Sequence, residues 1–228
     1  MEKNNGHLNL MAVIFFIGKR MEITECKKCG TCCKKGGPSF HTEDKPLIEN
    51  GLILLKFLFT IRKGEPANDN IQNRIIFADT DIIKIKTYEN SETCIFFDNT
   101  KSRCKIYRNR PLECMVLKCW DTAEIREVYS KNRLIRKDLV YKIKGLWDLI
   151  EEHHEHCSYD KITDLIDEFN AGKNDKALKK IDEMAGYDKH LRQLLLEKGH
   201  IEAEITDFLF GRPVFKILRG FGLKIKGR

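Results

Sequence analysis

The hydrophobic and polar positions along the first half of the chain predict short elements. Residues 52–61 are strongly apolar and predict a buried helix, although a run of this length also fits a buried strand. Residues 67–73 are polar and predict a loop. Residues 75–77 and 82–86 carry β-branched residues and an alternating pattern, which is typical of half-buried strands in a small sheet.

Further short elements surround the cysteines of this half. Residues 94–97 and 104–107 predict two strands, and the turn-rich residues between them favour an antiparallel hairpin. This hairpin would bring Cys94 and Cys104 into one neighbourhood. A short helix is expected from a Thr42 cap to Gly51.

The residues after the hairpin predict a helix that begins at Pro111, because proline suits the first turn of a helix. Cys114 would lie about one turn into this helix. A thiolate is stabilised near the positive end of a helix, so we expect the pKa of Cys114 to be lowered.

The second half shows helical periodicity. Asp121 and Glu124 resemble a capping box at the start of one long amphipathic helix that runs to about His156. The fold class is therefore α+β and mostly helical, with a cysteine-rich core, a small antiparallel sheet or hairpin, and a helical C-terminal half. Further helices are predicted at 160–170, 175–185, 188–198 and 201–210, ending at Gly172, Gly186, Gly199 and Gly211, and residues 213–226 form a basic, aromatic tail.

The N-terminal residues contain an apolar run at 10–17 that is too short to span a membrane and lacks a small-residue cleavage site after it. We interpret residues 1–20 either as an upstream extension with Met21 as the start, or as a poorly ordered tail or a strand added to the domain. Residues 21–157 would then form the cysteine-cluster domain, and residues 158–228 a helical region packed on it. We expect a cytoplasmic protein, where thiols stay reduced.

Composition and charge fit a globular chain with a basic excess. The 228 residues are 33% charged and 42% hydrophobic, which excludes a disordered chain, and their formal net charge is +7. This charge would suit RNA or a membrane surface. Many of the lysines and arginines, however, lie close in sequence to a cysteine and would compensate metal-bound thiolates. We therefore expect metal ions as partners, and no nucleic acid.

The nine cysteines are the main candidate chemistry. C-x-x-C spacing presents two sulfurs to one ion, and a C-x-x-C-x-x-C run presents three. Adjacent side chains usually diverge, so Cys32 and Cys33 are expected to serve different metals, or one metal and a structural role. Disulfides or buried apolar thiols are the alternative. The expected ligands form a first group, Cys26, Cys29, Cys32 and Cys33, and a second group, Cys94, Cys104, Cys114 and Cys119.

Cys157 stands apart from both groups. It lies beside His153, His154 and His156 at the end of the long predicted helix. These residues fit either a His/Cys metal site or an exposed helix end where cationic histidines are favourable, and the sequence leaves both open.

The cysteine motifs resemble those of the zinc- or iron-chelating cysteine cluster family, named for its CxxCxxCC motif and known as YkgJ-type. The resemblance covers about residues 21–120. The matching pieces are Cys26-x-x-Cys29-Gly30-x-Cys32-Cys33, Thr60-Ile61-Arg62-x-Gly64-Glu65 and Cys94…Cys104-x-Ile106-Tyr107-x-x-Arg110-Pro111-x-x-Cys114. The resemblance implies chelation of zinc or iron, and the motif also occurs in flagellin lysine N-methylases.

Sulfur ligands suit zinc and iron equally, so the cofactor is zinc or iron, with a 4Fe-4S cluster as one form. Two functions of different classes follow: a metal-binding module, and an iron–sulfur enzyme that modifies a protein, with Tyr107 and Arg110 beside the cluster. A third, a basic zinc protein on RNA, requires a continuous lysine and arginine face away from the sulfurs. A closed sulfur shell favours the module, and exposed titratable groups beside the cluster favour the enzyme.

Overall fold

The computed structural model describes residues 25–172 and 175–220. The predictions for residues 1–20 and for Met21 lie outside these ranges, and so does the part of the basic tail after Gly220. No helix in the described ranges is long and apolar enough to cross a bilayer.

The strands of the described part form three separate antiparallel pairs, all within the first half of the chain. They are β1 (Leu58–Ile61) with β4 (Ile82–Ile85), β2 (Pro66–Asp69) with β3 (Arg74–Phe77), and β5 (Phe97–Asp98) with β6 (Arg103–Cys104). The register of the last pair places Phe97 opposite Cys104. The predicted hairpin between the cysteines is thus present, with shorter strands than expected.

Helices occur along the whole described part, short in the first half and longer in the second. The α-helices are α1 (Lys45–Glu49), α2 (Leu112–Val116), α3 (Ala123–Val128), α4 (Arg136–Val140), α5 (Leu146–His156), α6 (Tyr159–Gly172), α7 (Asp175–Lys198), α8 (Thr206–Phe210) and α9 (Val214–Gly220). The 3₁₀ helices are η1 (Cys32–Lys34), η2 (Thr42–Asp44), η3 (Leu55–Phe57), η4 (Tyr107–Asn109) and η5 (Ala203–Ile205). The α+β fold class is confirmed.

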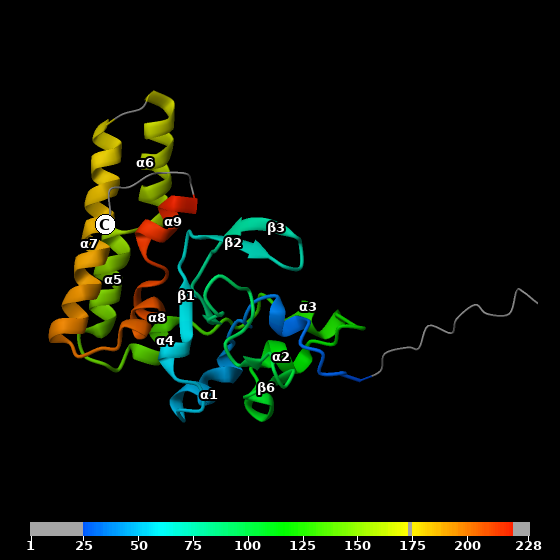
Figure 1. The fold of residues 1–228 in the computed structure, drawn as a ribbon. Helices are drawn as coiled ribbons and strands as arrows, with labels where there is room; N and C mark the ends of the chain where they lie inside the picture. Colours follow the sequence, from blue (N-terminus) through cyan, green and yellow to red (C-terminus); the bar gives the residue numbers. More distant parts are fainter. Residues whose placement is uncertain (1–24, 173–174, 221–228) are drawn as a thin grey trace, which may run out of the picture.

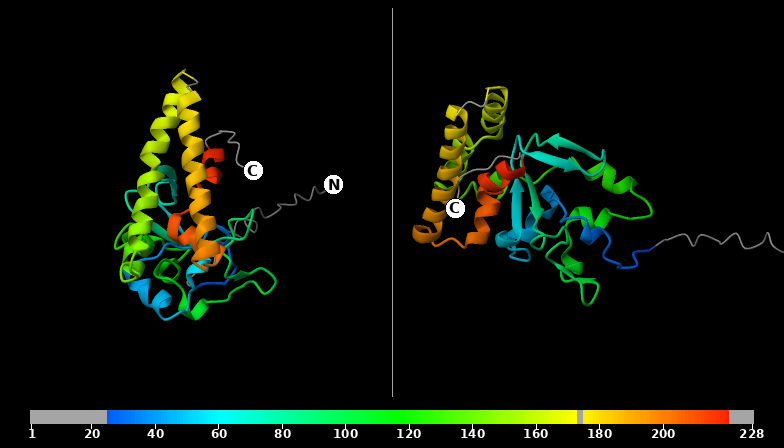
Figure 2. Two further views of the ribbon diagram at one scale, coloured as in Figure 1. Left: turned by 90° about the vertical axis from the view of Figure 1, so that its left-hand side faces the viewer. Right: turned by 45° about the horizontal axis from the view of Figure 1, so that its top comes forward.

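The long helices and the strands lie on opposite sides of the molecule. Figure 1 shows α6 and α7 as an antiparallel pair on one side, with the strands and helices α1 to α3 on the other. The right-hand view of Figure 2 shows the same separation. Helix α8 joins the two sides, because it packs against β1 and also contacts α5.

The apolar run at 52–61 is not the predicted helix. It forms η3 and then β1, whose side chains alternate between buried and half-buried positions and pair with β4. A continuous apolar run lacks the period that separates a buried helix from a buried strand, so pairing with β4 decided its structure. The predicted loop at 67–73 is also partly wrong, since β2 occupies its first residues.

The long helix predicted from Asp121 to His156 is divided into α3, α4 and α5. Asn132 and Gly145 interrupt it, with φ values of +50° and +75°, which a right-handed helix does not contain. At Gly186, in contrast, the sequence predicted a break that is absent. Helix α7 continues through this residue and joins the two predicted helices at 175–185 and 188–198. A helix tolerates an internal glycine at a cost of about 1 kcal/mol, which packing of α7 against α6 offsets.

Buried apolar side chains form two clusters. The first surrounds β1 and β4, with Leu58 and Ile83 at its centre, and receives Phe208 and Phe210 from α8. The second lies between α6, α7 and α9 and includes Cys157. The division into domains at residue 157 stays a prediction, and the first cluster extends across it, because Leu191 and Phe208 belong to that cluster.

A buried carboxylate holds three of the C-terminal helices together. Asp188 on α7 accepts hydrogen bonds from His153 Nε2 of α5 (2.8 Å), Arg192 Nε of its own helix (2.9 Å) and the backbone N–H of Val214 of α9 (3.0 Å). Burial lowers the pKa of His153 to about 4, although the Asp188 carboxylate acts in the opposite direction. The histidine is therefore neutral at pH 7.

Asp188→Asn is expected to lower the free energy of unfolding by about 3 kcal/mol, because it weakens three buried hydrogen bonds and leaves Arg192 with Asp207 as its remaining charge partner, at 3.5 Å. Urea unfolding measures this. Asp167→Asn, on the exposed face of α6, is the matched control and should change stability by less than about 0.5 kcal/mol. Equal effects would contradict the role of Asp188.

Stability is expected to fall as the pH drops from about 6.5 towards about 4. In this window His153 takes up a proton in the unfolded chain, where its pKa is near 6.5, while the buried side chain resists protonation until its lowered pKa of about 4. Protons thus favour unfolding. His153→Gln should reduce the slope of the unfolding free energy against pH. An unchanged slope would contradict the assignment of this pH dependence to His153.

Candidate metal centre

The first cysteine group lies in a loop that packs on the β5–β6 hairpin. Gly30 adopts a left-handed φ of +77°, and a Cβ atom on it would lie 2.1 Å from Cζ of Phe97. Lys34 Nζ lies 5.6 Å from the centroid of the same ring. Only glycine permits this approach, so Gly30 brings the loop onto the hairpin.

Backbone hydrogen bonds fix the loop beside the second cysteine group. The N–H of Cys94 donates to the carbonyl of Cys33 (2.8 Å), and the N–H of Gly36 donates to the carbonyl of Glu92 (2.7 Å). Cys104 then lies opposite Phe97 across the hairpin. The expected proximity of Cys94 and Cys104 is confirmed, and Cys33 joins them.

Two buried carboxylates hold α2, the helix that carries Cys114. Asp44 accepts a hydrogen bond from the N–H of Leu112 at the start of α2 (2.7 Å) and another from the N–H of His41 (2.9 Å). Glu113 accepts one from the N–H of Ser39 (2.7 Å). The segment just after the first cysteine group is therefore joined directly to α2.

The Glu113 carboxylate also interacts with two side chains. Arg133 Nη1 donates to it at 3.2 Å, and His41 Nε2 lies 3.3 Å from the same oxygen. Hydrogen bonding to His41 lowers the pKa of Glu113 against the opposing effect of burial. Sequence reasoning missed this network; the only local signal was a carboxylate next to Cys114 in an otherwise apolar helical turn.

Five sulfurs from four segments interact electrostatically. Hydrogen bonding with the Cys33 thiol lowers the pKa of Cys32 to about 6, and raises that of Cys33. Burial, followed by the charges of neighbouring sulfurs, raises the pKa of Cys94 and Cys114; burial is also the main cause of the raised pKa of Cys104. These thiols can therefore not all ionise unless a cation neutralises them.

One expectation about these sulfurs is wrong. The pKa of Cys114 is raised instead of lowered, because burial outweighs the dipole of a five-residue helix. That Cys32 and Cys33 serve different metals, or one metal and a structural role, stays a prediction, although both sulfurs interact with Cys104. The turn of η1 keeps the two adjacent sulfurs in the same neighbourhood.

The other predicted ligands are exposed: Cys26, Cys29 and Cys119. Hydrogen bonding to Thr31, whose Oγ1 lies 3.2 Å from its sulfur, lowers the pKa of Cys29, and the charge of Cys32 also acts on it. In the described ranges, no three Cys, His, Asp or Glu side chains already have the arrangement of a metal site. The donor set nonetheless fits zinc or iron, because both prefer sulfur ligands and five thiols share one neighbourhood.

Arg110 lies beside these sulfurs, as expected from the sequence. Its guanidinium stacks 3.8 Å from the centroid of the Tyr107 ring, and its charge acts to lower the pKa of Cys32 and Cys104. Lys28 Nζ lies 5.1 Å from the same ring. Arg110 therefore supplies positive charge where thiolates would accumulate negative charge.

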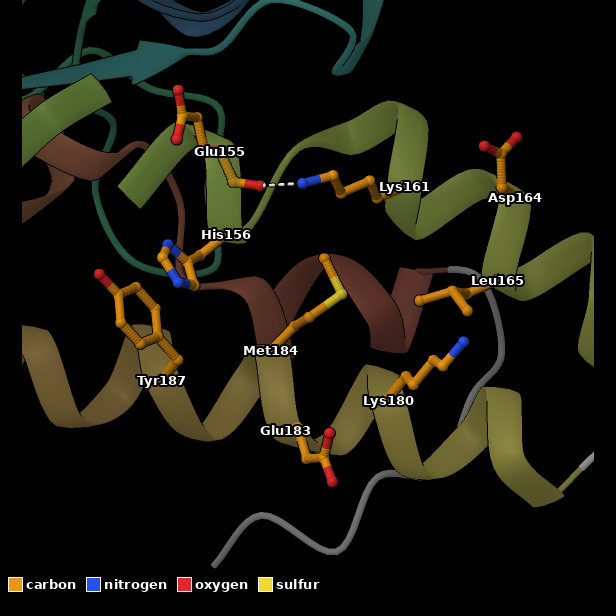
Figure 3. A pocket seen from close by; sticks show the side chains of 9 residues that line it. All are labelled: Glu155, His156, Lys161, Asp164, Leu165, Lys180, Glu183, Met184 and Tyr187. Carbon is orange, nitrogen blue, oxygen red and sulfur yellow. Dashed lines mark hydrogen bonds between the residues drawn. The ribbon is translucent and has the colours of Figure 1, made fainter. Parts of the chain in front are cut away.

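The histidines near Cys157 do not form a metal site. His153 is buried against Asp188, and His156 stacks on Tyr187 with ring centroids 4.5 Å apart. The sulfur of Cys157 is buried and donates weakly to the carbonyl of Met184 (3.5 Å). His156 and Tyr187 instead border a groove of about 620 Å³ between α6 and α7 (Figure 3).

Comparison with known families identifies this arrangement. A family model described as "CxxCxxCC: Putative zinc- or iron-chelating domain" matches residues 25–138, which is half of the chain. The chain belongs to the CxxCxxCC family. The match includes both cysteine groups and ends before Cys157, so the family assigns zinc or iron chelation to the part of the chain that contains the five interacting sulfurs. No curated protein and no solved structure matches the chain.

Gly30→Ala is expected to lower the free energy of unfolding by about 3 kcal/mol and to weaken metal binding, because its methyl group would displace the Phe97 ring. Gly36→Ala is the matched control: Gly36 also has positive φ, but no atom of the described residues lies within 4 Å of the point that its Cβ would occupy. The free energy of unfolding of Gly36→Ala should fall by about 1 kcal/mol, because only backbone strain contributes. Urea unfolding and zinc titration measure the stability and the metal affinity of the two variants. Equal losses in both variants would contradict the packing of Gly30 against Phe97.

Proposed function

We propose that the protein is a metal-binding module that chelates zinc or iron through the thiolates of both cysteine groups. The observation that carries this proposal is that the structure holds the segments of five cysteines together. The N–H of Cys94 donates to the carbonyl of Cys33, and Cys104 lies opposite Phe97 in the adjoining hairpin. Two buried carboxylates, Asp44 and Glu113, join the helix that carries Cys114 to the segment after the first cysteine group. Apart from the adjacent Cys32 and Cys33, the five cysteines lie ten or more residues from one another in the sequence, and they share no catalytic motif. Their convergence is explained by a common cation.

The exposed thiols extend this proposal to all eight cysteines. Cys29 already lies close enough to Cys32 for their charges to interact, and Cys26 precedes it in the same loop. We infer that this loop closes over the metal when it binds, and that Cys119 approaches from the turn after α2. Zinc would supply a structural cross-link there, and a 4Fe-4S cluster would supply one-electron transfer.

The charge distribution supports metal chelation over RNA binding. Residues 26–35 contain four lysines, and residues 98–120 contain six lysines and arginines against two carboxylates, so these segments carry +8 while the whole chain carries +7. The basic excess therefore belongs to the cysteine segments. An RNA-binding face away from the sulfurs would require the opposite distribution.

The surroundings of the sulfurs favour a module over an enzyme. The Glu113 carboxylate, whose charge acts on Cys114, and the His41 imidazole are buried and bonded to each other and to the backbone. Groups held in this way position the helix and are not available to a substrate. An iron–sulfur enzyme related to the flagellin lysine N-methylases is the alternative, and the free state of all nine cysteines fits either function in a reducing compartment such as the cytoplasm.

Metal analysis after anaerobic purification, with an absorption spectrum, tests the proposal. Cys104→Ser and Cys114→Ser should each weaken metal affinity by at least roughly a hundredfold, because each removes a metal–sulfur bond. Cys157→Ala is the matched control, since its thiol lies in the other apolar cluster, and should retain the metal. Stoichiometric metal in all three variants, or none in the wild type, would refute it.

A further inference from the structure

A small cavity lies where the strand-rich side of the molecule meets α4 and α5, apart from both cysteine groups. Its volume is about 210 Å³. Liquid water occupies about 30 Å³ per molecule, so the cavity has room for a small ion and not for a nucleotide. The polar residues of its lining are Lys63, Thr80, Asp81, Arg136, Trp147, Glu151 and His154.

Two buried polar atoms on this lining have no hydrogen-bond partner among the described residues. They are Nε1 of Trp147 and Nδ1 of His154. The indole nitrogen is a donor only, so what it lacks is an acceptor. An unpaired buried donor costs about 1–3 kcal/mol, which makes an acceptor inside the cavity favourable.

The charges around the cavity are mainly positive. Arg136 donates to both carboxylate oxygens of Asp81, at 2.7 and 3.0 Å, so this pair is close to neutral. Lys63 is exposed at the rim opposite Glu151 of α5. Arg62 is fully buried nearby, and its Nε and Nη2 atoms have no partner in the described part of the chain.

The direction of the pKa shift of His154 indicates the sign of the electrostatic potential in the cavity. Its pKa is lowered, first by burial and then by the charges of Arg62, Arg136 and Lys63, whereas Asp81 acts in the opposite direction. With Arg62 included, three cations lie around the cavity against two carboxylates, Asp81 and Glu151, and this excess of one positive charge attracts an anion.

We propose that this cavity binds a small oxyanion, which accepts hydrogen bonds from the Trp147 indole and from Lys63, with His154 beside it. The shared chemistry is that of sulfate, phosphate and small carboxylates. The site is independent of the metal centre, since none of its residues is a cysteine or contacts one of the five interacting sulfurs. A bound oxyanion would connect the strand-rich side of the protein to α5.

Tryptophan fluorescence tests the site directly. The chain contains two tryptophans, so Trp120→Phe leaves Trp147 as the only reporter. This protein is titrated with sulfate, whose charge is constant from about pH 5 to about pH 8, and with chloride at equal ionic strength. We expect a saturable change with sulfate alone. A succinate titration then decides whether carboxylates also enter, and an identical response to sulfate and chloride would overturn the site.

Variants separate local binding from a general salt effect. Lys63→Met should weaken sulfate binding by roughly tenfold, because it removes a charged donor at the rim. Lys179→Met, which removes another exposed lysine, from α7, should leave it unchanged. Both residues are on the surface, so neither variant should disturb folding. Equal affinities for the two variants would refute the assignment.

The pH dependence provides a second readout. Sulfate binding should tighten as the pH falls from about 8 to about 5, because the anion favours the protonated form of His154. The other charged groups that face His154 are Arg62, Arg136 and Lys63 as cations, with Asp81 and Glu151 as anions. His154→Gln should abolish most of this tightening, and an unchanged pH profile would overturn the role of His154.

Discussion

The proposed metal centre depends on two buried carboxylates that are not among its predicted ligands. Asp44 and Glu113 accept backbone N–H groups from both sides of the junction between the first cysteine group and α2. A helix of five residues has almost no stability of its own, so these bonds hold α2 in place. The position of Cys114 relative to Cys33 therefore follows from the protein framework, and in the proposed centre a metal would draw the remaining sulfurs towards it.

This framework divides the sulfurs into two populations. The thiols of Cys33, Cys94, Cys104 and Cys114 are buried or half-buried, whereas Cys26, Cys29, Cys32 and Cys119 are exposed. A cation that enters from solvent would meet the exposed thiols first and then the enclosed ones. The basic residues around them limit the negative charge that builds up when the thiols ionise.

The helical half contributes to the same fold through buried polar contacts. Arg62, next to β1, donates to the carbonyl of Cys157 at the end of α5 (3.0 Å) and lies 4.6 Å from the Tyr159 ring centroid. Thr60 of β1 donates to the carbonyl of Phe208 in α8 (2.7 Å). Such buried donors need fixed partners, so they determine how the long helices sit against the strands.

The sequence by itself determined the cysteine spacing, the hairpin that unites Cys94 with Cys104, and the family. These features are local, and short-range spacing and turn composition encode them. Only the tertiary structure decided that the run at 52–61 becomes a strand, that α7 passes through Gly186, and that Cys114 is buried with a raised pKa. The reason is physical: pairing partners, burial and the charges of residues distant in sequence set these outcomes, and no local pattern contains them.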